Sequence, residues 1–391
     1  MRALLALTGL ALALSAPARA DVLGAERLAV RLVTWGPEPV TLAEAQAAVE
    51  ETDAFVRANS FGKAWLEADV AGWLHVLPRR PTRCDTAGIN ATVQQAVPGL
   101  AGYSRVAYLL PRIDCPWTGA YYPPGVWMLG EISMTLLAHE LGHNWGLTEE
   151  GPAWVCERGR CVARDYGDPF SVMGHGHGHF GAYEKWTFGW INRVGPELRD
   201  GEVTIARIDS PSLQPHALYV LAGNEEYWIE YRPEVAGLVV HGGPSLVDPS
   251  TSSRYPKKNL LLSAGPRRFA VPGAFEVRAA GIDAATARLS FRWTDRTRPT
   301  KPRVATSVRR RTVRLRFRAT DRGSGVGAYH VSVDGRRRAV VPTSEEVGRL
   351  VFGRDPEHAL RLPRGMHRIS ILAVDRARNR SRATVRTVRI R

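Results

Sequence analysis

Two histidines and a glutamate stand at helical spacing in segment 139–150, HELGHNWGLTEE. His139 and His143 are four residues apart, so on a helix both imidazoles project from one face, one turn apart. That spacing lets both rings bind one Zn²⁺ at about 2.0–2.1 Å. Glu140 could then act as general base, taking a proton from metal-activated water and passing it to a leaving amine. The pattern predicts metal-assisted hydrolysis.

The third metal ligand is expected a few residues beyond the helix. Gly146 would let the chain turn sharply and return a later residue to the metal. The spacing H-E-x-x-H-x-x-G-x-x places Glu149 at that position, and a carboxylate oxygen binds zinc at about 2.0–2.2 Å. Glu150 is adjacent and is expected to point elsewhere unless the loop differs. A carboxylate ligand would make the zinc a weaker Lewis acid, which predicts slower hydrolysis or a more alkaline optimum.

The tract GHGHGHF offers rival ligands in His175, His177 and His179. Histidine-rich tracts can bind metal, so one of these side chains could replace the carboxylate. Just before the tract, Met173 in SVMG is an apolar residue in a glycine-rich turn and is expected to be no ligand.

The helix that carries the histidines is expected within an α/β layer. Segments 27–36 and 63–77 read as strands, and segment 41–60 between them reads as a helix. Thr41 and Glu44 form a capping-box signature at its start. The segment EISMTLLAHELGHNWG is the next strong helix, with Gly146 at its C-terminal stop.

Beyond about residue 196 the pattern changes to short strands separated by turn residues. This predicts two β-sandwich-like domains, 196–295 and 296–391, after an α/β (α+β) domain over 21–195. The last module resembles an immunoglobulin or fibronectin module, and TDRTRPTKP reads as the linker before it.

The positive charge of the chain is concentrated at its C-terminal end. The 391 residues carry a formal net charge of +15, whereas residues 296–391 alone hold 26 Lys and Arg against 7 Asp and Glu. Such a module would be drawn to an anionic cell-surface polymer. Its positive charges are nearly all arginines scattered along strands, which favours compositional bias slightly over an anionic partner. A nucleic-acid partner is not expected.

The N-terminus and the cysteines indicate export. Arg2, the apolar run ALLALTGLALALSA and the small-x-small site Ala18–Ala20 predict a secretory signal peptide over residues 1–20. No later apolar run is long enough to span a bilayer. Four cysteines in an exported chain suggest two disulfides, with Cys84–Cys115 and Cys156–Cys161 the favoured pairing.

Taken together, several segments resemble the gametolysin-like branch of the metzincin zinc metalloproteases, with some likeness to the immune-inhibitor-A type. They are FVRANSFGKAWLEADVAGW, YLLPRIDCPWTGAY, LLAHELGHNWGL, YGDPFSVMG and YEKWTFGWI, spread over residues 25–295. The resemblance implies a secreted zinc endopeptidase that cleaves protein or peptide substrates. It also implies a Met-turn at Met173 beneath the metal. The family usually has His where this chain has Glu149, and some metzincins have Asp there. In some metzincins a tyrosine two residues after the Met-turn methionine helps to hold the oxyanion, so the resemblance implies that His175 could donate a hydrogen bond to it.

A second hypothesis remains open, because a protease scaffold can lose its activity. The chain would then be a non-catalytic surface-binding protein that uses the cationic C-terminal module. Glu140 favours the enzyme, since a scaffold has no need of a proton-transfer carboxylate.

Overall fold

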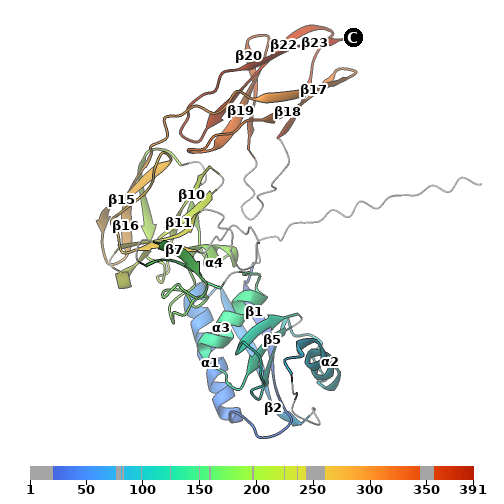
Figure 1. Cartoon of the computed structure of the whole chain (residues 1–391), viewed down its shortest axis with the longest axis vertical. Coiled ribbons are helices and arrows are strands. Elements are labelled where there is room, and N and C mark those ends of the chain that lie inside the picture. Colours follow the sequence, from blue (N-terminus) through green and yellow to red (C-terminus); the bar gives the residue numbers. More distant parts are fainter. Residues whose placement is uncertain are drawn as a thin grey trace, which may run out of the picture.

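The computed structural model describes residues 21–75, 81, 83–97, 99–123, 125–148, 150–157, 160–195, 198–223, 225–235, 237–243, 260–343 and 356–391. The predicted signal peptide over residues 1–20 and the predicted third ligand Glu149 lie outside these residues. In Figure 1 the chain passes from α/β elements in blue and green, through further sheets, to the orange and red strands that end at the C-terminus.

The first part of the chain is the predicted α/β layer. Its five-stranded sheet has the order β2-β1-β3-β5-β4, and all neighbours are parallel except the edge pair β4 and β5. Helices α1 and α3 pack on one face, and α2 packs on the other. The elements are β1 (Gly24–Thr34), α1 (Leu42–Ser60), β2 (Ala64–His75), α2 (Thr86–Ala96), β3 (Arg105–Leu110), β4 (Gly119–Tyr122), β5 (Gly125–Leu129) and α3 (Met134–Asn144).

Helix α1 begins as its sequence predicts. The Thr41 hydroxyl accepts a hydrogen bond from the Glu44 N–H (3.2 Å), and the Glu44 carboxylate accepts one from the Thr41 N–H (2.7 Å). This reciprocal capping box satisfies two N–H groups that the helix itself cannot pair.

A seven-stranded sheet of order β7-β6-β13-β12-β11-β10-β8 follows. Alternate residues of its strand β10 face two different cores: Tyr219 and Leu221 join the core of the α/β layer, whereas Leu218 and Val220 join a second core. The elements in this stretch are β6 (Ala153–Glu157), β7 (Arg160–Arg164), α4 (Ala182–Thr187), β8 (Arg193–Val194), β10 (Ala217–Ala222), β11 (Glu225–Arg232), η1 (Pro233–Val235), β12 (Gly237–Gly243) and β13 (Leu261–Ala264).

The sheet joins residues from both sides of the domain boundary expected after residue 195. Strands β6, β7 and β8 precede that position, and β10 to β13 follow it. Dividing the chain into two domains after residue 195 would separate hydrogen-bonded strands. It would also expose one face of the core that contains Trp228. The boundary therefore falls inside a shared sheet.

The remaining strands form three smaller sheets. A sheet of order β14-β15-β16-β9 covers the second core, and the sheets β17-β18-β21 and β20-β19-β22-β23 enclose a third core. The last two are the β-sandwich expected for the C-terminal module. The strands are β9 (Gly201–Ala206), β14 (Arg268–Val271), β15 (Phe275–Ile282), β16 (Thr286–Trp293), β17 (Arg303–Arg309), β18 (Thr312–Arg318), β19 (Val326–Val333), β20 (Arg336–Pro342), β21 (Glu357–Arg361), β22 (Gly365–Asp375) and β23 (Thr384–Ile390).

The disulfide Cys84–Cys115 is confirmed, and it ties the start of α2 to the segment after β3. Cys156 is also disulfide-bonded and lies opposite Cys161 in the register of β6 and β7. The side chain of Cys161 lies outside the described residues, so that pairing stays a prediction. Within the described part of the chain, no helix has the length and apolar character needed to cross a membrane.

The chain that follows α3 packs backbone to backbone on the turn around Met173. Gly151 has a φ of +46°, and a Cβ at this position would lie 2.3 Å from the Gly174 nitrogen and 2.5 Å from the Met173 carbonyl carbon. The Gly151 carbonyl also accepts a hydrogen bond from the Asp168 N–H (2.9 Å). Glycine is needed here for its conformation and for its lack of a side chain.

Gly151→Ala should lower the free energy of unfolding by at least about 2 kcal/mol, because the new methyl group adds a backbone clash to a strained φ. Thermal or urea unfolding measures the loss. Gly72→Ala is the matched control, since a Cβ at Gly72 meets nothing within 4 Å. Equal stability of the two variants would show that the turn is not packed as described.

Candidate metal centre

Helix α3 carries His139, Glu140 and His143 into the interior. The helix begins at the N-cap Ser133, whose hydroxyl accepts a hydrogen bond from the Leu136 N–H (3.2 Å). Its apolar residues Leu137 and Leu141 pack in the core, and this packing buries His139 and Glu140, which are 7% and 4% exposed. Gly146, with a φ of +106°, then ends the helical segment as its sequence predicts.

Each histidine is held by its Nδ1 atom. His139 Nδ1 lies 3.0 Å from the Val172 carbonyl oxygen, and His143 Nδ1 lies 2.9 Å from the Leu147 carbonyl oxygen. A carbonyl oxygen can only accept, so both Nδ1 atoms donate. The two Nε2 lone pairs are thereby directed toward each other across 3.2 Å. Metal-binding histidines are oriented in this way, because the ring nitrogen that does not bind the metal donates a hydrogen bond to a neighbouring oxygen.

The carboxylate of Glu150 completes the group. Its Oε2 atom lies 3.0 Å from His139 Nε2 and 3.1 Å from His143 Nε2. The expectation that Glu150 points elsewhere is therefore wrong. The Tyr166 N–H donates to the Glu150 carbonyl oxygen (2.7 Å), and the packing of Gly151 fixes the next residue, so the local backbone turns this side chain inward.

The chemistry of the three atoms fits a metal ion. Two imidazole lone pairs and a carboxylate oxygen are all acceptors, so together they require a shared proton or a cation. Tetrahedral zinc with bonds of about 2.0–2.1 Å separates its ligand atoms by about 3.3 Å, close to the separations found here. Among the described residues, His139, His143 and Glu150 form one of two groups of His, Cys, Asp and Glu that could hold a metal ion.

Electrostatics reinforce this arrangement. Burial acts to raise the pKa of Glu150, but when the His139 and His143 rings carry a proton on Nε2 as well as on Nδ1, their hydrogen bonds and charge outweigh burial and hold the pKa well below its ordinary value. The carboxylate is therefore ionised at neutral pH and supplies the negative charge that a divalent cation would neutralise.

The pKa of Glu140 is shifted in the opposite direction, above its ordinary value. Burial raises the pKa of Glu140 to about 7, and its Oε2 atom is buried without a hydrogen-bond partner in the described structure. A Cβ at Gly119 would lie 2.4 Å from Glu140 Oε1, so the carboxylate presses against strand β4. A carboxylate whose pKa lies near 7 is well placed to exchange protons at neutral pH.

Tyr166 is a site residue that the sequence did not reveal. Its ring stacks on His139 with centroids 5.7 Å apart, and its side chain hydrogen-bonds to Glu150. Burial and the charge of Glu150 raise its pKa above the ordinary value, so the phenol stays protonated and donates to the carboxylate. Its left-handed φ of +57° is uncommon for a tyrosine and could not be inferred from the segment DYGDPF.

The three histidines of the GHGHGHF tract lie apart from this group. His175 Nδ1 contacts the Tyr166 carbonyl oxygen, and His177 Nδ1 lies 2.9 Å from the Thr135 hydroxyl. His179 Nδ1 lies 3.0 Å from the Lys185 amine, and burial together with the charges of Lys185 and Arg232 lowers its pKa to about 3. None of the three belongs to the groups of described residues that could hold a metal ion.

Met173 is fully buried beside α3. A Cβ at Gly142 would lie 2.5 Å from its sulfur, and the carbonyl of the preceding residue, Val172, orients His139. Glu184 is also buried, and its carboxylate accepts hydrogen bonds from Ser171 (2.8 Å) and from the Gly181 N–H (2.6 Å). These contacts give Glu184 a capping role at α4.

A buried charged network fixes the segment that contains Met173. Arg232 on β11 donates to Glu230 (2.5 Å) and to the Phe170 carbonyl oxygen (3.0 Å). His241 on β12 lies 2.8 Å from Asp168, whose other oxygen accepts from the Phe170 N–H. Contacts from the seven-stranded sheet thus fix the loop that contains Val172, whose carbonyl oxygen orients His139.

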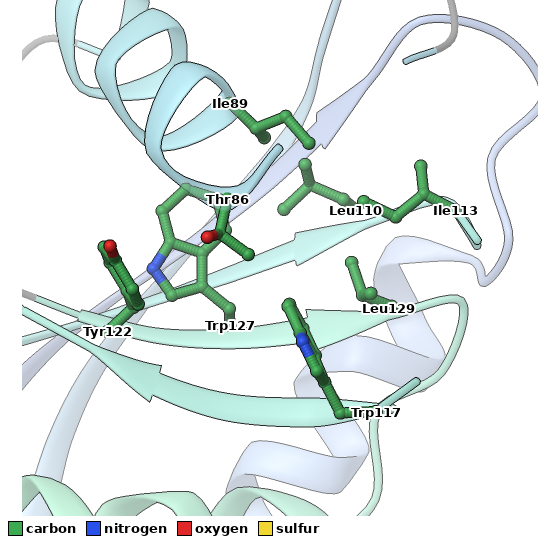
Figure 2. A pocket seen from close by; sticks show the side chains of 8 residues that line it. All are labelled: Thr86, Ile89, Leu110, Ile113, Trp117, Tyr122, Trp127 and Leu129. Carbon is green, nitrogen blue, oxygen red and sulfur yellow. The ribbon is translucent and has the colours of Figure 1, made fainter. Parts of the chain in front are cut away.

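Strand β4 borders the site, whereas the apolar pocket drawn in Figure 2 lies on the other side of the sheet. The pocket is lined from α2 and from residues such as Leu110, Trp127 and Leu129, which face away from α3. Their neighbours Leu109 and Met128 face α3. Trp117 and Tyr122 also line this pocket.

Comparisons with known proteins give weak likenesses. Neither a family model nor a curated protein matches the chain. Archaemetzincin from Methanopyrus kandleri is 16% identical over 42% of this chain and 94% of its own length, with a TM-score of 0.27. The PKD1 domain of the Vibrio cholerae metalloprotease PrtV is 10% identical over 24% of this chain and 98% of its own, with a TM-score of 0.18.

The fibronectin(III)-like modules of Clostridium thermocellum CbhA are 13% identical over 23% of this chain and 96% of their own length, with a TM-score of 0.17. At scores this low, none of these structures assigns the chain to a family. The resemblance to gametolysin-like metzincins is not confirmed by them.

His241→Gln should destabilise the protein more at pH 5.5 than at pH 9. Burial opposes the charged imidazolium, but the hydrogen bond and charge of Asp168 outweigh burial and raise the pKa of His241. A raised pKa in the folded state gives stability that is complete below the unfolded value of about 6.5 and is lost as pH rises through the folded value. Glutamine can still donate to Asp168 but cannot become charged.

The measurement is the difference in unfolding midpoint between wild type and variant across that pH range, both without added metal. A difference that stays constant, or that grows toward alkaline pH, would contradict a charged His241 in the folded protein.

Proposed function

We propose that the chain is an exported zinc-dependent endopeptidase in which His139, His143 and Glu150 hold the metal and Glu140 is the general base. The observation that carries the proposal is the meeting of three atoms that could bind a metal beside Glu140, whose buried Oε2 atom has no hydrogen-bond partner among the described residues. Glu150 thereby takes the place first expected for Glu149.

Zinc, when bound, supplies a Lewis acid that polarises the scissile carbonyl and lowers the pKa of water. The protein supplies the rest of the chemistry. The hydrogen bonds of His139 and His143 to backbone carbonyls fix the direction of both ligating nitrogens. Tyr166 donates to Glu150 and holds that carboxylate against the two rings.

Glu140 can move the proton that hydrolysis requires. It can accept a proton from the water that attacks the peptide carbonyl and deliver the same proton to the amine nitrogen as the C–N bond breaks. Its pKa of about 7 suits both halves of this transfer. A buried carboxylate oxygen without a hydrogen-bond partner, such as Glu140 Oε2, lowers the stability of the fold. Because such costs are typical of functional sites, this favours the enzyme over a non-catalytic scaffold.

The neighbouring strand supports a peptide as substrate. Strand β4 lies at the edge of its sheet, and Gly119 at its start adjoins Glu140. An exposed edge offers unpaired backbone N–H and C=O groups, so an extended peptide can add to it as a further strand. Such a peptide would pass beside Glu140 with its backbone aligned for cleavage.

Glu140→Gln should leave zinc binding intact and reduce kcat for casein or a peptide by at least about 100-fold, because proton transfer is lost while the ligands remain. Zinc content and hydrolysis are measured on the same preparation. Glu131→Gln, which removes an exposed carboxylate at residue 131, is the control. Stoichiometric zinc with equal activity in all three proteins would refute the enzyme and support the non-catalytic scaffold.

Glu150→Gln should weaken zinc binding by at least about 100-fold, since changes outside the ligand set alone cost about 10–100-fold. Glu149→Gln is the matched control and should bind zinc nearly as wild type does. Competition with a chromogenic chelator measures both affinities. The reverse order would make Glu149 the ligand, as its spacing from the helix first suggested.

A further inference from the structure

A second acidic cluster lies where the C-terminal module joins the rest of the chain. Asp295 follows β16, Asp321 lies between β18 and β19, and Asp375 ends β22. Each carboxylate offers an oxygen that lies within 4.8 Å of the other two. Three segments far apart in sequence thus bring negative charge to one point.

The cluster is largely buried. Asp295 and Asp375 are 1% and 3% exposed. Asp375 Oδ1 accepts a hydrogen bond from the Asn379 N–H (2.7 Å), whereas its Oδ2 is inaccessible to solvent and has no partner in the described structure. A buried carboxylate oxygen without a donor, on a side chain that lies beside two further carboxylates, is an unusual and costly arrangement.

The described contacts of the cluster come from neutral donors. Asp295 accepts from the N–H and hydroxyl of Thr297 and from the N–H and hydroxyl of Ser324, all within 2.8 Å. Asp321 accepts from the Gly325 N–H (2.7 Å). These hydrogen bonds orient the carboxylates but leave their combined charge in place.

We propose that Asp295, Asp321 and Asp375 bind a calcium ion. All the donor atoms are oxygens, which Ca²⁺ prefers and which distinguish this site from the His139 and His143 centre. The free Oδ2 atom of Asp375 is the oxygen that a cation would take up. Backbone carbonyl groups and water would complete the six to eight ligands that Ca²⁺ requires.

The position of the site gives the ion a structural role. Ala377, two residues beyond Asp375, packs against the second core, and a Cβ at Gly325 would lie 2.6 Å from the Gly223 carbonyl oxygen of the β10–β11 turn. Asn379 donates to the Asp295 carbonyl oxygen (3.2 Å). Calcium would therefore fasten the C-terminal module to the sheet that supports the metal centre.

Calorimetric titration of the full chain with CaCl₂ tests the site. The zinc-saturated Glu140→Gln protein is used, so that self-cleavage does not interfere. We expect one ion per chain, with a Kd of about 0.1–1 mM as in other extracellular modules. Calcium should also raise the unfolding midpoint and slow proteolysis of segment 296–301. Absence of binding up to about 10 mM would overturn the proposal.

Variants locate the ion. Asp375→Asn and the less buried Asp321→Asn should each weaken calcium binding at least about tenfold, because ligand charge sets affinity. Asp334→Asn, in the same module but outside the cluster, should leave it unchanged. Unchanged affinity in Asp321→Asn would overturn the assignment even if Asp375→Asn failed to fold. Without calcium, Asp375→Asn should be at least as stable as its parent, and lower stability would contradict the crowding of like charges.

Discussion

The convergence of three acceptor atoms constrains the rest of this molecule. His139 Nε2, His143 Nε2 and Glu150 Oε2 lie 3.0–3.2 Å apart, and none of them has a proton to share while both Nδ1 atoms donate to carbonyl groups. Such a group is stable only around a positive charge. The fold must therefore hold α3, the chain after Gly146 and the loop before Met173 in fixed relative positions.

Those positions depend on the seven-stranded sheet as much as on the α/β layer. Arg232 and His241 reach from β11 and β12 into the segment that contains Phe170, and their buried contacts fix the Val172 carbonyl that orients His139. Breaking a buried ion pair on one side costs about 3–5 kcal/mol. The β strands after residue 195 thus support the candidate metal centre.

The sequence predicts local features well and the meeting of distant segments poorly. The capping box at Thr41, the helix with His139 and His143, and the turn at Gly146 follow from short-range spacing. Strands with clear alternation were also predictable, whereas β4, β6 and β7 are short, and turn residues surround them.

The choice between Glu149 and Glu150 shows the limit most clearly. The direction of Glu150 depends on a backbone hydrogen bond from Tyr166 and on the contact of Gly151 with Gly174, both outside the motif. The histidine tract shows a similar limit: its composition suits a metal, and the contacts of its side chains with the Tyr166 carbonyl, Thr135 and Lys185 depend on distant segments.

Anomalous diffraction at the zinc edge, from crystals of the zinc-loaded protein, tests the central claim most directly. We expect one strong peak about 2.0–2.2 Å from His139 Nε2, His143 Nε2 and a Glu150 oxygen, with Glu140 unbound beside it. A peak coordinated by Glu149, or by a histidine of residues 175–179, would contradict the account, as would the absence of zinc from these side chains.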